Sequence, residues 1–335
     1  MLDIPRLERI RLTRYPLSQR IMGQFLRVNY ECLPGVSIRI EGENRLPQEP
    51  SIFAMNHTDR YNYWPFQYAL WRRWNRFTAT WVKGKYYETA VMGKFMEKMN
   101  QLPTISRGYI ITRDFLEVTK RTPTAEEYSI LRGWVDESFE LNRAAERDEE
   151  ILSRVPERIL TEGRNSLGRE FDPSKESYPE YVNGTFHTMM ALFVALNDQT
   201  HEVGLEILVF PQGTRSKRLL PSRTGISELA LRLKCPIVPV GCSGSDLVYP
   251  GSSPWGKKGE CIYRIGEPIA YRSIPEYEVG EDFQPFTRDS QVRFGDKFEA
   301  LAAVVTERID QLLDEPYRLS SEATKNDRSE SERFV

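Results

Sequence analysis

Two short apolar runs that each end in a polar loop place the strongest limit on how this chain can fold. Residues 51–55 read Ser-Ile-Phe-Ala-Met and are followed by Asn-His-Thr-Asp-Arg. Roughly 150 positions later, residues 207–210 read Ile-Leu-Val-Phe and are followed by Pro-Gln-Gly-Thr-Arg. Short apolar runs bounded by turn residues are typical of buried strands. Because ligands bind at the carboxyl edge of an open α/β sheet, we expect these two loops to meet across one crevice.

The composition is typical of a globular protein with a large core. Of 335 residues, 40% are hydrophobic and 28% are charged, and both fractions are ordinary for a soluble domain. The net charge of −2 gives no support to nucleic acid as a partner. The four cysteines lack metal-binding spacing, and no apolar window approaches 18 residues, so we expect neither a metal site nor a spanning helix. We predict a cytoplasmic protein whose membrane contact is peripheral.

His57 is the candidate general base. It is one of three histidines, and the others fall in a helix-like segment (His187) and a polar loop (His201). The unperturbed pKa of histidine is about 6.5, close to physiological pH, which suits proton transfer. In the second loop, the guanidinium of Arg215 can bind an anion through two parallel hydrogen bonds.

These loops resemble the motifs of the glycerolipid acyltransferase family, of the lysophosphatidic acid (1-acylglycerol-3-phosphate O-acyltransferase-like) type. The first motif of that family reads Asn-His-(four residues)-Asp, and Asn56-His57 with Asn62 follows its spacing. The third reads Phe-Pro-Glu-Gly-Thr-Arg-Ser, and residues 210–216 differ from it only at Gln212. Arg107 falls where the second motif ends in arginine, and residues 237–240 resemble the fourth.

The resemblance implies a fold, a reaction and a set of site residues. The fold class is α/β: a single domain with a mixed, largely parallel sheet flanked by helices and carrying a helical insertion. The reaction moves a fatty acyl group from acyl-CoA or acyl carrier protein to the hydroxyl of a lysophospholipid or glycerol-phosphate-like acceptor, without a metal or bound cofactor. His57 is implied as general base. The implied acceptor-binding residues are Arg107, Gln212, Gly213, Thr214 and Arg215.

Two departures from the family exchange a carboxylate for an amide. Asn62 can accept a hydrogen bond from the His57 ring, but its amide can equally donate one and favour the other tautomer. Asp59 is an alternative partner for the ring, two positions from it. The departures leave a second hypothesis open, a catalytically silent relative that binds lipid as a sensor or adaptor. A third hypothesis, an acyl-thioester hydrolase, lacks the Gly-x-Ser-x-Gly turn at residues 241–245.

The domain plan has an N-terminal segment, one α/β domain and a tail. Residues 1–35 are predicted to be amphipathic and helical, and they either lie in an anionic membrane surface or pack on the domain. The acyltransferase-like domain spans 36–318, with a helical insertion at 108–185. Within the insertion, 144–160 is predicted as an exposed helix and 162–180 as a loop. A helix is expected over 181–196 and a disordered tail over 319–335.

Overall fold

The computed structural model describes residues 1–142, 149–280 and 283–319. Its main feature is a seven-stranded sheet in the order β1-β9-β8-β2-β7-β3-β4. The five strands from β8 to β4 run parallel to one another, and β9 is antiparallel to β8. The predicted α/β fold with a mixed, largely parallel sheet is therefore confirmed. The strands of this sheet are β1 (Val36–Glu41), β2 (Ile52–Met55), β3 (Thr78–Lys83), β4 (Gln101–Thr104), β7 (Glu206–Val209), β8 (Ile237–Ser243) and β9 (Gly259–Ile265).

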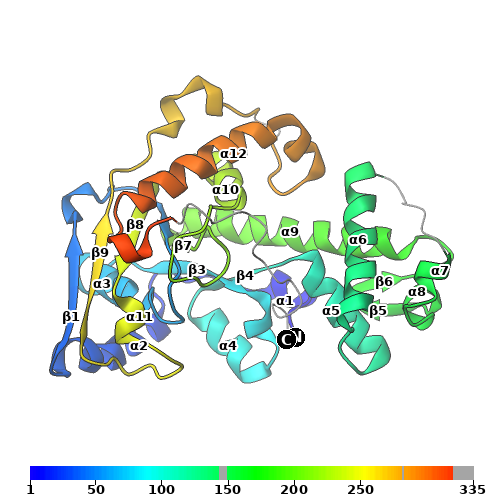
Figure 1. The fold of residues 1–335 in the computed structure, drawn as a ribbon, viewed down its shortest axis with the longest axis horizontal. Coiled ribbons are helices and arrows are strands. Elements are labelled where there is room, and N and C mark those ends of the chain that lie inside the picture. Colours follow the sequence, from blue (N-terminus) through cyan, green and yellow to red (C-terminus); the bar gives the residue numbers. More distant parts are fainter. Residues whose placement is uncertain (143–148, 281–282, 320–335) are drawn as a thin grey trace.

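Helices cover both faces of the sheet (Figure 1). Alternate side chains of β2 point to opposite faces, as the pleat of a strand requires. Ile52 and Ala54 pack with helices α10 and α12, whereas Phe53 and Met55 pack with α2 and α3. Burial on both faces explains why β2 reads as a continuous apolar run. These helices are α2 (Leu17–Arg27), α3 (Trp64–Trp74), α10 (Gly225–Leu233) and α12 (Arg288–Asp310).

The remaining helices belong to the N-terminal segment, to the insertion or to connections between strands. They are α1 (Ile4–Arg9), α4 (Ala90–Lys98), α5 (Arg107–Thr119), α6 (Ala125–Leu141), α7 (Glu149–Leu152), α8 (Arg158–Thr161), α9 (Tyr178–Glu202) and α11 (Ser245–Val248). Short π or 3₁₀ turns occupy Val28–Cys32, Glu43–Arg45, Gly84–Tyr87, Tyr271–Ser273, Pro275–Tyr277 and Glu315–Tyr317. Within the described ranges, no helix combines the length and apolar character needed to cross a membrane.

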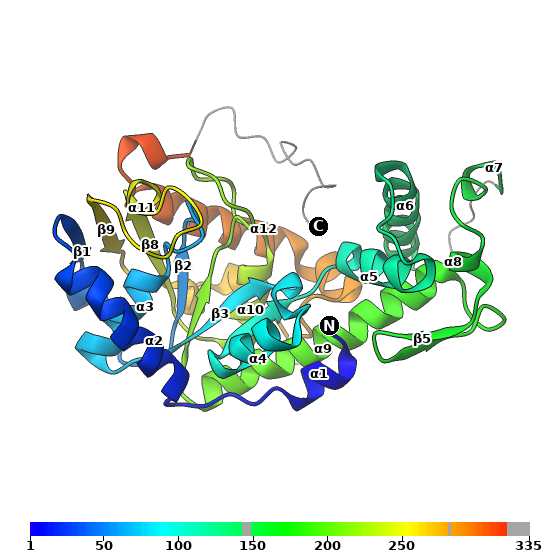
Figure 2. The same cartoon turned by 90° about the horizontal axis from the view of Figure 1, so that it is seen from below.

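The insertion contains a hairpin that the sequence did not predict. Strands β5 (Arg164–Ser166) and β6 (Arg169–Phe171) pair inside the stretch expected to be a loop. Leu167 and Gly168 form the two-residue turn, both with positive φ, as a hairpin turn of this length requires. Leucine rarely adopts this conformation, so the turn gave no sequence signal. In Figures 1 and 2 the hairpin lies at the end of the molecule opposite β1 and β9.

Two other predictions in the insertion need correction. The exposed helix predicted over 144–160 is wrong where the structure describes it, because α7 and α8 are separate short helices. Pro156 lies between them, and proline cannot continue a helix interior. Helix α9 begins at Tyr178, earlier than predicted, because Ser177 and Glu180 form a capping box there. The predicted disordered tail lies almost wholly within 320–335, outside the described residues.

The N-terminal segment divides into a buried part and an exposed part. Leu2, Ile4, Leu7, Ile10 and Leu12 are at most 9% exposed and belong to the core that α9 and the insertion share. Arg6 is also buried, and its guanidinium binds Glu97 at 2.7 Å. Residues 2–12 therefore pack on the domain. In contrast, α2 presents apolar side chains to solvent.

Truncation of Leu7 tests whether the first helix is part of the core. Leu7 is 2% exposed, so Leu7→Ala should lower the free energy of unfolding by about 2–5 kcal/mol. Leu17, which is 65% exposed, is the matched control, and Leu17→Ala should change stability by less than about 0.5 kcal/mol. Chemical denaturation of both variants measures the difference. Equal stability of the two variants would contradict the packing of α1.

Candidate functional site

The two loops expected to meet do meet, because their strands are neighbours. Strands β2 and β7 are parallel with Ile52 opposite Ile207, so both end at the same edge of the sheet. The backbone N–H of Ser216 donates to the carbonyl oxygen of His57 at 2.8 Å. The His57 ring stacks on Phe210, with centroids 4.0 Å apart and planes 17° from parallel. The stacking partner of His57 is thus the first residue of the third motif.

A second neighbour strand fixes the His57 loop from the other side. The side-chain amide of Asn56 donates to the carbonyl oxygen of Cys242 at 2.9 Å and accepts from the N–H of Cys242 at 2.7 Å. Cys242 lies in β8, which pairs with β2. Both residues are buried, so this pair of hydrogen bonds holds Asn56, the residue before His57, rigidly against the sheet.

Asn62 is the described partner of the imidazole. Its Oδ1 lies 3.1 Å from His57 Nδ1, and its Nδ2 donates to the carbonyl oxygen of Asn56 at 2.7 Å. The residues between His57 and Asn62 form a turn that leads into α3, and this turn brings position 62 back to the ring. The spacing of the first motif therefore works geometrically with an amide at its end.

Asp59, the alternative partner, points elsewhere. Its carboxylate accepts from the backbone N–H of Tyr61 at 2.8 Å and from the hydroxyl of Thr58 at 2.9 Å. Burial raises the pKa of Asp59, while the hydrogen bonds that its carboxylate accepts oppose that shift. These contacts hold the loop and do not reach the His57 ring. The sequence could not distinguish the two positions, because an irregular loop has no fixed side-chain period.

The environment of His57 keeps its ring neutral. The pKa of the half-buried ring is lowered to about 4, mainly by burial and to a smaller extent by the positive charges of Arg215 and Lys83. The hydrogen bond to Asn62 opposes this shift. A neutral imidazole can accept a proton at pH 7, although a low pKa makes it a weak base. The positive charge of Arg215 thus acts on the ring.

The loop after β7 contains a buried amide and an exposed cation. Gln212 is fully buried, whereas Arg215 is exposed. The Nε2 group of Gln212 donates to the carbonyl oxygen of Thr214 at 2.8 Å, and its Oε1 accepts from the N–H of His57 at 3.3 Å. Gly213 has a φ of 72°, which favours glycine. The loop therefore presents backbone and a guanidinium to solvent beside His57.

Arg107 is held by the insertion. Its guanidinium lies between the rings of Phe139 and Phe186, 3.7 and 4.4 Å from their centroids. Nε donates to Asn183 Oδ1 at 2.7 Å, and Nη1 is 3.9 Å from Asp136. Burial lowers the pKa of Arg107 to about 10, so it remains a cation. The described contacts of Arg107 thus tie α5 to α6 and α9, and none of them joins it to the other candidate residues.

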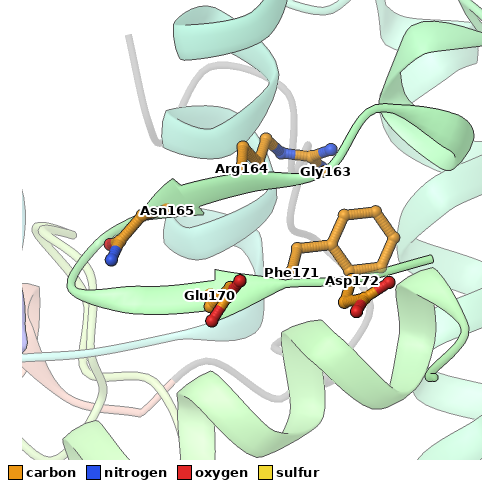
Figure 3. A pocket seen from close by; sticks show the side chains of 6 residues that line it. All are labelled: Gly163, Arg164, Asn165, Glu170, Phe171 and Asp172. Carbon is orange, nitrogen blue, oxygen red and sulfur yellow. The ribbon is translucent and has the colours of Figure 1, made fainter. Parts of the chain in front are cut away.

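A separate hollow lies on the β5–β6 hairpin. Figure 3 shows its lining, which includes Arg164, Glu170 and Phe171. The Arg164 guanidinium is already bound to both oxygens of Asp114, at 2.8 and 2.7 Å. Figures 1 and 2 place this hairpin far from the site edge of the sheet. Over the described ranges there is also no cluster of three or more His, Cys, Asp or Glu side chains that could hold a metal ion.

The comparison with protein families finds a match in the region that contains the third motif. Residues 184–243 match the model of the family described as Acyltransferase. They include the loop from Gln212 to Arg215 and exclude His57. The resemblance to acyltransferases is confirmed.

Two curated relatives carry the same description, 1-acyl-sn-glycerol-3-phosphate acyltransferase. The protein from Cocos nucifera is 43% identical over 51 residues, which cover 15% of this chain and 17% of the relative. The protein from Saccharomyces cerevisiae is 39% identical over 89 residues, 25% of this chain and 29% of the relative. The chain thus spans less than a third of the length of these relatives.

One solved structure is that of the 1-acyl-sn-glycerophosphate (LPA) acyltransferase, PlsC, from Thermotoga maritima. The structural alignment covers 92% of this chain and 77% of the Thermotoga maritima chain. Its TM-score is 0.38 at 12% sequence identity. This likeness is too weak to add to the assignment.

Proposed function

We propose that this protein transfers a fatty acyl group from a thioester, acyl-CoA or acyl carrier protein, to the hydroxyl of a lysophospholipid or glycerol-phosphate-like acceptor. The observation that carries the proposal is the contact between the His57 ring and the loop that contains Arg215. Acyl transfer to a phosphate-bearing alcohol needs a proton acceptor and a cationic binding group within one small site. Both curated relatives are named for acyl transfer to 1-acyl-sn-glycerol 3-phosphate.

In this proposal the imidazole of His57 carries one proton from the acceptor hydroxyl to the leaving thiolate. It takes the proton of the acceptor hydroxyl while the hydroxyl oxygen attacks the thioester carbonyl carbon. The tetrahedral intermediate collapses, the carbon–sulfur bond breaks, and the leaving thiolate takes the proton back from the imidazolium. The products are an ester and a free thiol. A phosphate on Arg215 would offset the positive charge that lowers the pKa of His57 and would make the ring a better base.

Replacement of His57 tests the reaction. A general base contributes roughly 100- to 10,000-fold, so His57→Ala should lower acyl transfer from labelled acyl-CoA to lysophosphatidate by at least about 100-fold. His187 is exposed on α9, and His187→Ala is the control that should keep full activity. Lysophosphatidate, other lysophospholipids and glycerol 3-phosphate form the acceptor panel.

Two outcomes would contradict the proposal. Equal inactivity of wild type and His57→Ala on the whole panel would indicate a catalytically silent lipid-binding relative. Release of free fatty acid at the same rate without an acceptor would indicate a hydrolase.

The proposal includes a membrane surface as partner, supported by an apolar stripe on α2 and the turn that follows it. Leu17, Ile21, Phe25 and Val28 are 43–65% exposed and recur at helical spacing. Phe25 contacts Trp255 at 5.0 Å, in the loop that follows α11. That loop is tied to the site, because the Tyr61 hydroxyl donates to the carbonyl oxygen of Ser252.

A second apolar group extends the same side of the molecule. Val91, Met92 and Phe95 of α4 are exposed, and Figure 1 shows α2 and α4 along one lower edge. Arg14, Arg20 and Arg27 are exposed on or beside α2. Apolar side chains flanked by arginines are suited to the headgroup layer of an anionic membrane.

Removal of the α2 stripe tests the membrane partner. Ile21→Ser with Phe25→Ser should weaken binding to vesicles of phosphatidylglycerol and phosphatidylcholine by at least about tenfold, because burial of a large apolar side chain is worth about 1.5–3 kcal/mol. Val292→Ser on α12, where Val292 is 70% exposed, is the control. Sedimentation with vesicles measures binding. Unchanged binding of the double variant would exclude α2 as the docking surface.

A further inference from the structure

The orientation of the Asn62 amide is fixed by its backbone partner. Asn62 is fully buried, and its Nδ2 donates to the carbonyl oxygen of Asn56 at 2.7 Å. A reversed amide would place two acceptor oxygens against each other at that distance. The Asn62 oxygen must therefore face His57 Nδ1, where it lies 3.1 Å away. Asn62 is also held from β9, because the hydroxyl of Tyr263 donates to the backbone carbonyl oxygen of Asn62 at 2.6 Å.

This orientation determines the tautomer of His57. An amide oxygen only accepts hydrogen bonds, so His57 Nδ1 carries the hydrogen and Nε2 keeps the lone pair. The charged groups that act on the ring, Arg215 and Lys83, are both cations and oppose a second proton. The ring is thus held neutral with one nitrogen free to take a proton from a hydroxyl.

Gln212 uses its amide in the same way between the two loops. Its Nε2 faces two carbonyl oxygens, of Thr214 at 2.8 Å and His57 at 3.4 Å, while its Oε1 faces the N–H of His57. An ionised carboxylate has no hydrogen to donate. Glutamate at position 212 would place a negatively charged oxygen against the carbonyl oxygens of Thr214 and His57. Aspartate at position 62 would place one against the carbonyl oxygen of Asn56.

We propose that Asn62 and Gln212 are a matched pair of positioning residues, whose amides hold His57 as the Nδ1–H tautomer and join its loop to the third-motif loop. The amides are thus required by this site, and a return to the carboxylates of the related motifs lowers turnover. The kinetic part of this inference rests on the proposed function, whereas the tautomer does not.

Nitrogen NMR of the intact protein tests the tautomer directly. The chain has three histidines, so ¹⁵N-histidine labelling gives few signals, and His187→Gln and His201→Gln assign them. At pH 7 wild-type His57 should show a protonated Nδ1 and an unprotonated Nε2. A hydrogen on Nε2 instead would overturn the proposal, whether or not the protein transfers acyl groups.

The carboxylate variants test the matched pair. Asn62→Asp, Gln212→Glu and the double variant should each lower kcat by at least about tenfold, a tenth of the loss expected without the base. Asn100 is the matched control, because its side-chain amide is also buried and hydrogen-bonded to backbone. The amide accepts from the N–H of Thr13 and donates to the carbonyl oxygen of Thr13. Asn100→Asp should destabilise the fold without changing the His57 tautomer or the pH–rate profile. Higher kcat in the double variant than in wild type would overturn the proposal.

The pH dependence of the melting temperature distinguishes the loss of the Asn62 contact from a general destabilisation of the fold. In the Asn62→Asp variant, a protonated carboxyl can donate to the Asn56 carbonyl as the native amide does, so the folded state should raise the pKa of that carboxyl. Stability is then close to wild type near pH 4 and is lost as pH rises through the raised pKa. We expect the melting temperature of Asn62→Asp to fall below that of wild type by at least about 3 °C more at pH 8 than at pH 4. A pH-independent difference would overturn the assigned contact.

Discussion

The parallel pairing of β2 with β7 and β8 is the constraint on which the site depends. Ile52 lies opposite Ile207 on one side and Ile237 on the other, so β2 and β7 end at the same edge while β8 continues beyond them to Ser243. The loop after β2 contains His57, the loop after β7 contains Arg215, and β8 supplies Cys242 to hold Asn56. A shift of one residue in this register would turn every side chain of β2 to the other face. Because both faces are buried, the register is strongly specified.

The chemistry of the site follows from the burial of the His57 ring and from the positive charges that act on it. Arg215 and Lys83 act on a half-buried ring, and the positions at which the related motifs have carboxylates hold amides instead. The amides satisfy backbone carbonyls that a carboxylate cannot, so geometry is retained while negative charge is lost. In the proposed reaction an acceptor phosphate would supply that charge. The free site would then be poorly basic and would become basic when its substrate binds.

The parts of the molecule that the sequence predicted are those encoded locally. Apolar runs before His57 and before Pro211 located two strands, and the spacing from His57 to Asn62 located the partner of the ring. Apart from the meeting of the two motif loops, the sequence did not predict contacts between distant segments. The aromatic clamp on Arg107 combines Phe139 of the insertion with Phe186 of α9, two residues far from Arg107 in the sequence. The turn at Leu167 uses a residue that rarely takes positive φ. The side chain of Leu7 proved to be buried because α9 and the insertion cover it.

The pKa of His57 with and without sn-glycerol 3-phosphate tests the account most directly, because it asks whether the ring and the anion-binding loop share one site. An NMR titration of the histidine signals should give a pKa of about 4 for the free protein. Saturating glycerol 3-phosphate should raise that value by at least about one unit, since a nearby anion favours the imidazolium. Glycerol, which lacks the phosphate, should leave it unchanged. An identical pKa with and without bound glycerol 3-phosphate would contradict a common site.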